Sequence, residues 1–153
     1  MGEIARLLPA SNIVVDLDVA TKPQLFEAMG RLLEAGTGLS PSRVAASLAA
    51  REKLGSTGLG QGIAIPHGRI KGLSEPVGAF ARLRTPIAFD APDGKAVGQL
   101  FVLLVPEQAT DRHLQLLSEL AQMFSDRGFR ERLAGAADRD GVASLFEHWE
   151  PAG

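Results

Sequence analysis

The sequence contains no cysteine and no tyrosine, and its 153 residues include only 7 phenylalanines and 1 tryptophan. The lack of cysteine excludes disulfides, thiol catalysis and thiolate metal sites, and it suits a reducing compartment. With so few aromatic residues, the core must be built mainly from Leu, Val, Ile and Ala. A chain of this length is typical of one core, so we expect residues 1–153 to form a single domain.

Long hydrophobic runs and an excess of one charge are also missing. The longest apolar stretch, Leu100–Val105, has the length of a buried strand and is far shorter than the roughly 20 residues of a membrane-spanning helix. The N-terminus does not resemble a secretory signal. With 16 basic and 18 acidic residues the net charge is −2, which gives no general attraction to nucleic acid or anionic lipid. We therefore expect a cytoplasmic protein that neither inserts into membranes nor binds nucleic acid.

Segments with strand-like and helix-like patterns alternate along the chain. Apolar runs bounded by turn residues predict strands at 13–17, 63–65, 77–83 and 99–105. Amphipathic spacing predicts helices that begin after Thr21, Ser40 and Thr110 and near residues 129 and 142. The continuous apolar strand at 99–105 is of the kind that is covered on both faces. This order predicts an α/β fold, specifically a three-layer α/β/α sandwich with a mixed central sheet.

Two local patterns refine this prediction. The tetrapeptide Ala91-Pro92-Asp93-Gly94 is typical of a hairpin-like turn. Thr110 is expected to cap a long helix. The residues expected to form the buried stripe of that helix are Leu114, Leu117, Leu120, Ala121 and Phe124.

His67 has the most distinctive setting of the three histidines. It follows Pro66 and precedes Gly68, directly after the predicted strand 63–65. Proline stops sheet pairing and glycine adds no bulk, so we expect the imidazole to lie accessibly in a loop at a strand end. Functional side chains often occupy such places. The alternative is a surface histidine without a role, which is also our interpretation of His148 beside Trp149.

The segment 55–62 upstream of His67 is rich in glycine. Its candidate binding residues are Ser56, Thr57, Gly58, Gly60, Gln61 and Gly62. Backbone N–H groups in such a segment can form a nest that holds an anion such as phosphate. No Gly-Lys-Ser/Thr follows and the segment leads into a strand, so it is neither a Walker A loop nor a dinucleotide-binding fingerprint. A flexible connector is the alternative interpretation.

His113 and Arg51 are the remaining candidates. His113 lies in the first turn of the helix after Thr110, where free N–H groups and the helix dipole favour an anion. Arg51 ends the second predicted helix, and a guanidinium can bind a phosphoryl group through two hydrogen bonds. From position alone, both are also compatible with solvated surface residues. The three scattered histidines lack metal-ligand spacing, so we predict no metal site, and we predict no cofactor.

Taken together, residues 51–68 form a recognisable motif, Arg-Glu-Lys-Leu-Gly-Ser-Thr-Gly-Leu-Gly-Gln-Gly-Ile-Ala-Ile-Pro-His-Gly. This motif resembles the active-site segment of the enzyme IIA family of the bacterial phosphotransferase system, in its fructose, mannitol and nitrogen-regulatory branch. Segments 85–90, 103–106 and 113–114 resemble that family too. The resemblance implies that residues 1–153 are one type-2 IIA domain. It also implies that His67 takes the phosphoryl group, that Arg51 and His113 assist, and that the glycine-rich loop shapes the pocket.

Within this branch the chain looks most like the nitrogen-regulatory, stand-alone members, although Gln61 stands where those often have Asn. The resemblance implies an HPr-like phosphocarrier as donor, itself charged by an enzyme I-like kinase that uses phosphoenolpyruvate. It further implies regulatory targets such as potassium transport or sensor proteins. The protein would then be a phosphohistidine carrier rather than an independent turnover enzyme.

Three other functions remain open at this stage. A fructose- or mannitol-type sugar component would pass the phosphoryl group to a IIB domain, but this chain contains no cysteine and no IIB segment. A hydrolase based on a pair of histidines would need a further catalytic group, and no Ser, Asp or Glu stands beside His67 in a recognisable motif. The third function is a binding module without turnover, in which His67 is never phosphorylated.

Overall fold

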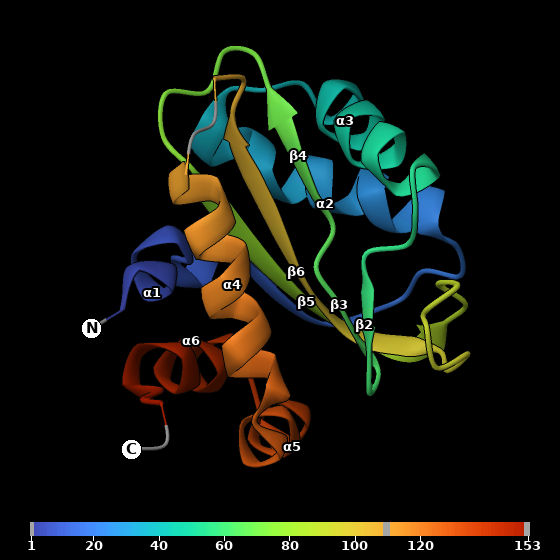
Figure 1. Ribbon diagram of the computed structural model, residues 1–153, viewed down its shortest axis with the longest axis vertical. Helices are drawn as coiled ribbons and strands as arrows, with labels where there is room; N and C mark the ends of the chain where they lie inside the picture. The colour runs from blue at the N-terminus through green and yellow to red at the C-terminus, as the bar shows by residue number, and fades with distance from the viewer. Residues whose placement is uncertain (1, 109–110, 152–153) are drawn as a thin grey trace.

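A mixed sheet forms the middle layer of the fold in our computed structural model, which describes residues 2–108 and 111–151 (Figure 1). Its strands are β1 (Ile13–Leu17), β2 (Gly58–Gly60), β3 (Ile63–Ala64), β4 (His67–Ile70), β5 (Val77–Ile87) and β6 (Val97–Pro106). The strand order is β1-β5-β6-β3-β2, and β4 pairs with β6 beyond the end of β3. β6 runs antiparallel to β5 and parallel to β3 and β4, so the predicted mixed sheet is confirmed.

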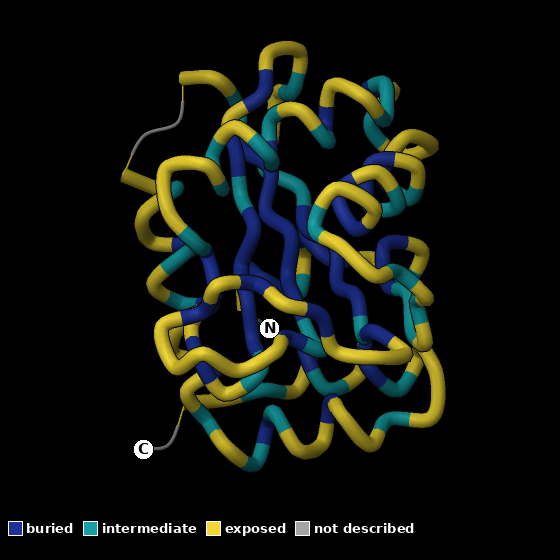
Figure 2. Tube along the Cα trace, turned by 90° about the vertical axis from the view of Figure 1, so that its right-hand side faces the viewer, coloured by how far each residue is buried: buried dark blue, intermediate teal, exposed yellow. Residues whose placement is uncertain are grey.

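Helices cover both faces of this sheet. One face carries α2 (Lys22–Thr37) and α3 (Pro41–Lys53). The other carries α1 (Glu3–Leu7), α4 (Asp111–Ser125), α5 (Arg127–Gly135) and α6 (Arg139–His148), while the short 3-10 helix η1 (Ala10–Asn12) leads into β1. Figure 2 shows the buried strands enclosed between helices whose outer sides are exposed. The three-layer α/β/α prediction is therefore confirmed.

Strand β6 is central, as its apolar sequence predicts. Leu103 and Leu104 are both 0% exposed, and they belong to the cores on opposite faces of the sheet. Successive side chains of a strand alternate between faces, so an unbroken apolar run serves two cores at once.

The predicted helix starts at Thr21 and Ser40 are correct. Thr21 Oγ1 accepts a hydrogen bond from Gln24 N, and Ser40 Oγ accepts one from Arg43 N, each satisfying an otherwise free N–H of a first helical turn. α2 ends at Gly38, which adopts a left-handed conformation with φ of 71°. The predicted cap at Thr110 lies outside the described residues.

Three boundaries differ from the prediction. The strand expected at 63–65 ends at Ala64, and after Ile65 and Pro66 the chain resumes as β4. His67 is therefore the first residue of a strand rather than part of a loop, because the interruption covers only Ile65 and Pro66 and the Pro66 carbonyl oxygen already accepts from Leu103 N. The strand expected at 77–83 continues to Ile87. The turn at 91–94 closes as predicted, with Gly94 N donating to Ala91 O.

The predicted buried stripe of α4 is wrong in part. Leu120 and Phe124 are buried as expected, but the other core residues are Leu116 and Met123. Leu114 is 66% exposed, Ala121 is exposed and Leu117 is only partly buried. The helix carries two overlapping apolar stripes, and spacing alone does not reveal which one faces the sheet. The second stripe faces the candidate site described below.

Candidate functional site

The strand pairing of β4 sets the direction of His67. His67 lies opposite Leu103 of β6, and Gly68 lies opposite Leu104. Leu103 belongs to the core beneath α4, so the His67 side chain shares the α4 face of the sheet. Gly68 faces α3 instead, where a Cβ would collide with Ser47 Oγ. The glycine therefore lets α3 pack closely against the strand that carries His67.

The His67 ring is held in one tautomer by a backbone carbonyl. Its Nδ1 lies 2.7 Å from the carbonyl oxygen of Ile65. A carbonyl oxygen only accepts hydrogen bonds, so Nδ1 of the neutral ring carries the proton. The lone pair is consequently on Nε2, the nitrogen at the outer side of the ring. A neutral imidazole with a fixed free nitrogen is a nucleophile.

His113 lies beside this ring. The two ring centroids are 5.8 Å apart with an interplanar angle of 69°, an edge-to-face arrangement. The fold thus brings together two residues that are far apart in the sequence, with His67 opposite Leu103 of β6. His113 Nε2 is buried and has no hydrogen-bond partner among the described residues.

Burial is the largest influence on the pKa of both histidines. Burial lowers the pKa of His67, and the positive charge of Arg51 lowers it further. The hydrogen bond to the Ile65 carbonyl raises the pKa, and the Glu52 carboxylate raises it more weakly, but neither outweighs the burial. Burial also lowers the pKa of His113, helped by the positive charges that His67 and Arg69 can carry. Both rings are therefore neutral at pH values near 7, the state that a histidine nucleophile requires.

Two arginines flank the histidine pair. Arg51, near the end of α3, lines the hollow around His67 together with Ser47, Leu54 and His113. Its Nη1 donates to Gly55 O at 2.8 Å, which holds the guanidinium against the loop after α3. Arg69 lines the same hollow and stands two residues after His67 in β4, so both side chains point to one face of the strand. The site thus offers two cationic groups to an anion.

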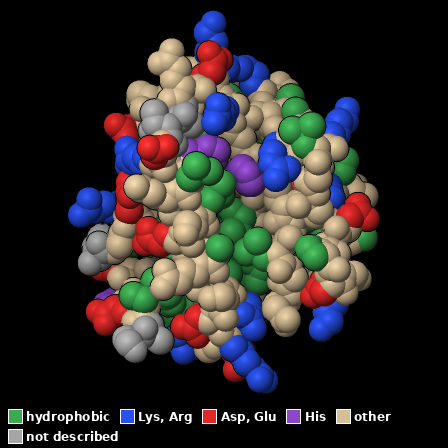
Figure 3. Space-filling model, viewed as in Figure 1, with side chains coloured by type: hydrophobic (Ala, Val, Ile, Leu, Met, Phe, Trp, Pro, Cys, Tyr) green, Lys and Arg blue, Asp and Glu red, His purple; other side chains and the backbone are tan. Residues whose placement is uncertain are grey.

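The hollow continues on the α4 side as an apolar strip. Its lining includes Leu59, Ile65, Leu117 and Ala121, next to His67 itself. Three large hydrophobic side chains are exposed on the elements that surround the hollow: Leu54 after α3 at 85%, Leu59 in β2 at 46% and Leu114 in α4 at 66%. Figure 3 shows the two imidazoles side by side at the surface, with hydrophobic side chains gathered next to them. Such exposed apolar patches mark protein-binding surfaces.

The glycine-rich segment is a hairpin rather than an open loop. Gln61 and Gly62 have φ of 59° and 79° and connect β2 to the antiparallel β3. A two-residue turn with two positive φ angles matches the right-handed twist of a hairpin. Ser56, Thr57 and Gly58 line the hollow beside His67. Gly60 and Gln61 line a different hollow, together with Gln99 and Arg130. Gly62 is the second residue of the turn between β2 and β3.

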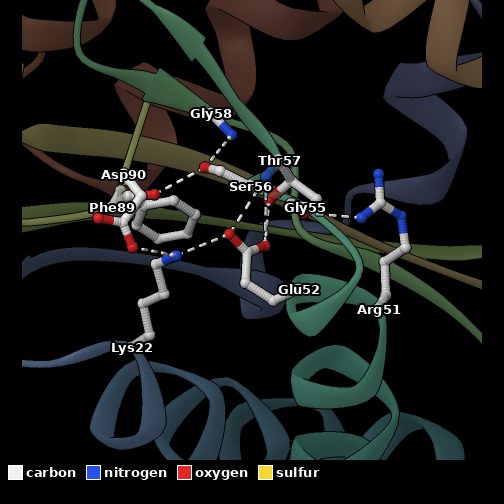
Figure 4. Close-up of polar contacts among 9 residues, drawn as sticks. All are labelled: Lys22, Arg51, Glu52, Gly55, Ser56, Thr57, Gly58, Phe89 and Asp90. Carbon is white, nitrogen blue, oxygen red and sulfur yellow. Dashed lines mark hydrogen bonds and ion pairs between the residues drawn. The ribbon is translucent and has the colours of Figure 1, made fainter. Parts of the chain in front are cut away.

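Three N–H groups of this segment already have side-chain acceptors within the protein. Thr57 N donates to the Glu52 carboxylate, Gly58 N to Ser56 Oγ and Gln61 N to Asp93 Oδ2. These three groups are thus not available as the anion nest that the sequence suggested. Figure 4 shows the Glu52 carboxylate at the centre of the contacts near Thr57. The side chain of Glu52 is only 7% exposed, and no local pattern in the sequence singles it out.

Metal-binding clusters and membrane-spanning helices are both absent from the described part of the chain. Residues 2–108 and 111–151 hold no cluster of three or more His, Cys, Asp or Glu placed to bind a metal ion. His148 lies at the end of α6 with its Nδ1 2.9 Å from Ser144 O, away from the other two histidines. No helix in these two ranges is both long and apolar enough to cross a membrane.

Comparison with known proteins defines the class to which this fold and site belong. The family described as "Phosphoenolpyruvate-dependent sugar phosphotransferase system, EIIA 2" matches residues 6–149, and the chain belongs to this family. Within it, a nitrogen regulatory protein of Pseudomonas aeruginosa is 40% identical over 146 residues, which is 95% of each chain. A nitrogen regulatory protein of Escherichia coli is 43% identical over 131 residues, 85% of this chain and 80% of the relative.

Solved structures agree with this placement. The crystal structure of the nitrogen regulatory protein IIA-Ntr from Neisseria meningitidis superposes with a TM-score of 0.89 at 51% identity, covering 94% of this chain and 99% of that one. The crystal structure of IIA mannitol from Escherichia coli superposes with a TM-score of 0.74 at 26% identity, covering 90% and 96%. Both similarities support the family, and the nitrogen regulatory proteins are the more similar of these relatives.

Proposed function

We propose that this protein is a cytoplasmic phosphocarrier that accepts a phosphoryl group on Nε2 of His67 from an HPr-like donor protein. One observation carries the proposal. The bond from Nδ1 to the Ile65 carbonyl at 2.7 Å leaves Nε2 as the nucleophilic nitrogen, in a hollow that Arg51 and His113 also line. Membership of the phosphotransferase EIIA 2 family supports the same assignment.

The transfer step needs positioning and charge compensation more than further reactive groups. The lone pair of His67 Nε2 attacks phosphorus in line with the bond to the donor. A phosphorus–nitrogen bond forms, and the bond to the donor breaks with its electron pair leaving on the donor. The Arg51 guanidinium compensates the charge of the phosphoryl oxygens, and the His113 ring donates or accepts a hydrogen bond beside them. The glycine-rich segment contributes a wall through Ser56, Thr57 and Gly58.

The apolar strip beside His67 fits the requirement for a protein donor. Leu59, Leu117 and Ala121 line it. Arg51 borders both the strip and the rest of the hollow, and Arg69 lines the hollow outside the strip. Covering this strip with a partner removes water from the reacting atoms, which strengthens the interactions of the phosphoryl group with Arg51. We infer that the HPr-like donor docks here through an apolar patch with acidic or phosphorylated groups at its margin.

We propose a regulatory rather than a sugar-transporting output. The support is the higher identity to proteins named nitrogen regulatory protein, 40–43% over most of the chain, than to the mannitol component at 26%. On this view the phosphorylation state of His67 controls binding to regulatory targets, such as potassium transport or sensor proteins. A fructose- or mannitol-type role, in which a IIB domain receives the phosphoryl group, is the second candidate, because the mannitol component shares the fold.

The test is mass spectrometry of the whole protein after incubation with phosphoenolpyruvate, an enzyme I-like protein and an HPr-like protein. We expect one acid-labile, alkali-stable phosphoryl group, lost when His67→Gln replaces the native chain and retained in the matched control His148→Gln. Label persisting in His67→Gln would reject the assignment. No label in the native chain would favour a binding module, and continuous release of phosphate would favour a hydrolase. Rapid transfer to a IIB protein would favour the sugar-component alternative.

A further inference from the structure

Glu52 carries a buried carboxylate beside the site, and the proposed transfer step does not use it. It lies next to Arg51 near the end of α3, and its side chain is 7% exposed. Oε1 accepts from Thr57 Oγ1 at 2.6 Å and Oε2 accepts from Thr57 N at 3.1 Å. Thr57 is itself only 6% exposed. The carboxylate thus fixes both polar donors of one residue, and Figure 4 shows it pointing at Thr57.

A continuous line of hydrogen bonds runs from this carboxylate to the reactive ring. The Thr57 carbonyl oxygen accepts from Ile65 N at 3.0 Å. The Ile65 carbonyl oxygen in turn lies 2.7 Å from His67 Nδ1. Glu52 holds Thr57, Thr57 holds Ile65, and Ile65 holds the imidazole. The N–H and C=O groups of Thr57 lie on either side of its Cα, and the same holds for Ile65, so the series acts by fixing the positions of these backbone groups.

The other side of the carboxylate is anchored to a separate part of the fold. Lys22 Nζ, at the start of α2, donates to Glu52 Oε2 at 2.9 Å and lies 3.6 Å from Asp90 Oδ2. The same ammonium lies 4.6 Å from the centroid of the Phe89 ring. Ser56 Oγ donates to Phe89 O at 2.6 Å. The carboxylate therefore joins the first turn of α2, the end of α3 and the segment before β6 to the backbone that orients His67.

We propose that Glu52 is a positioning residue for phosphoryl transfer: through Thr57 and Ile65 it sets the tautomer of His67 and thereby the nitrogen that takes the phosphoryl group. The effect on phosphoryl transfer rests on the proposed function. The tautomer of His67 does not, because it can be measured in the unphosphorylated protein. A carboxylate suits the role because it only accepts. Gln at this position would present one amide NH₂ to the donors of Lys22 or Thr57, and one of these contacts would be lost.

The first test compares the ¹⁵N shifts of the His67 ring in the native protein, in Glu52→Gln and in the matched control Glu34→Gln, an exposed carboxylate on α2. We expect the Nδ1–H tautomer in the native protein and in the control. In Glu52→Gln we expect both tautomers, because the Ile65 carbonyl is no longer held in place. Thr57→Val, which removes the hydroxyl but keeps the N–H, should give a smaller shift in the same direction. It also supplies the measurement if Glu52→Gln does not fold.

The second test measures transfer from the phosphorylated donor. Glu52→Gln should lower the rate at saturating donor by about tenfold, with the half-saturating donor concentration changed by less than about twofold, because docking residues are untouched. The inference is refuted if Glu52→Gln keeps the Nδ1–H tautomer and the native rate while only the melting temperature falls. If the native protein accepts no phosphoryl group, the proposed function fails, and the tautomer measurement still decides the role of Glu52.

Discussion

Gly68 gives the sharpest test of how the helix layer positions the site. A Cβ at this residue would collide with Ser47 Oγ and would lie 3.3 Å from Ser47 O. The Gly68→Ala variant must therefore turn the Ser47 hydroxyl away from Arg69 O or push β4 away from α3, and we expect the second, at the cost of about 1–3 kcal/mol that overpacking carries. Because β4 carries His67 and α3 carries Arg51, the same displacement separates the nucleophile from its cationic neighbour.

The collision is with a side-chain atom, so it can be removed. In Ser47→Ala the hydroxyl that donates to Arg69 O at 2.9 Å is lost, which costs about 0.5–1.5 kcal/mol. In the double variant the new Cβ meets only the backbone of residue 47, at 3.3 and 3.4 Å. If Gly68→Ala costs about 2 and Ser47→Ala about 1 kcal/mol, simple addition gives about 3 kcal/mol, whereas we expect the double variant to cost about 1–1.5 kcal/mol.

Urea unfolding of the four proteins gives the coupling free energy, and transfer from a phosphorylated donor gives the functional consequence. Gly68→Ala should slow the transfer, and the second substitution should restore most of the rate along with the stability. Two results would refute the reasoning. One is a Gly68→Ala protein as stable as the native chain. The other is a double variant whose loss equals the sum of the two single losses, because the close contact would then not be the cause.

Four further predictions concern the histidines, Arg51 and the hairpin turn. His113→Leu removes a buried nitrogen that has no hydrogen-bond partner among the described residues. The melting temperature should therefore stay unchanged or rise, while phosphoryl transfer slows. A large drop in the melting temperature would contradict this prediction. Gln61→Asn, at φ of 59° in the hairpin turn, should stabilise the protein by a few tenths to about 1 kcal/mol in urea unfolding. Because the pKa of His67 is lowered, the unfolded chain binds more protons below about pH 6.5, so stability should fall on acidification through that range, and less steeply in His67→Gln. For the same reason the acid limb of the transfer rate should lie below about pH 6.5, and Arg51→Gln should move it upward in a pH–rate profile, since Arg51 contributes to the lowering.

Most of the fold follows from local patterns in the sequence. The caps at Thr21 and Ser40 and the apolar run of β6 predict the elements that the structure contains, because each depends on neighbouring residues. The α4 stripe could not be assigned because two apolar faces overlap along one helix. Leu114 and Leu117 satisfy a core spacing, yet Leu114 is exposed and Leu117 lines the hollow beside His67. Only packing against β6 decides which face is buried.

The residues of the candidate site could be predicted from the sequence, but the contacts that orient them could not. His67, Arg51 and His113 were singled out by local setting and family resemblance, and they line one hollow. The burial of Glu52 was not foreseeable, because its partners Lys22 and Thr57 come from α2 and from the start of the hairpin. A charged residue near a helix end is usually solvated. Its partners appear only once α2 and α3 pack together.

The glycine-rich segment shows why a motif and its mechanism are separate questions. Composition suggested free N–H groups that would cradle phosphate, but the structure directs the N–H of Thr57 to a carboxylate that the protein supplies itself. A built-in anion at this point would repel a second one, so the segment cannot act on phosphate as a Walker loop does. Its rigidity serves another purpose: Thr57 holds Ile65, and Ile65 aims the imidazole. Under the proposed function, Arg51 and Arg69, which line the hollow with His67, would compensate the phosphoryl charge, so different groups would orient the imidazole and bind the phosphoryl group.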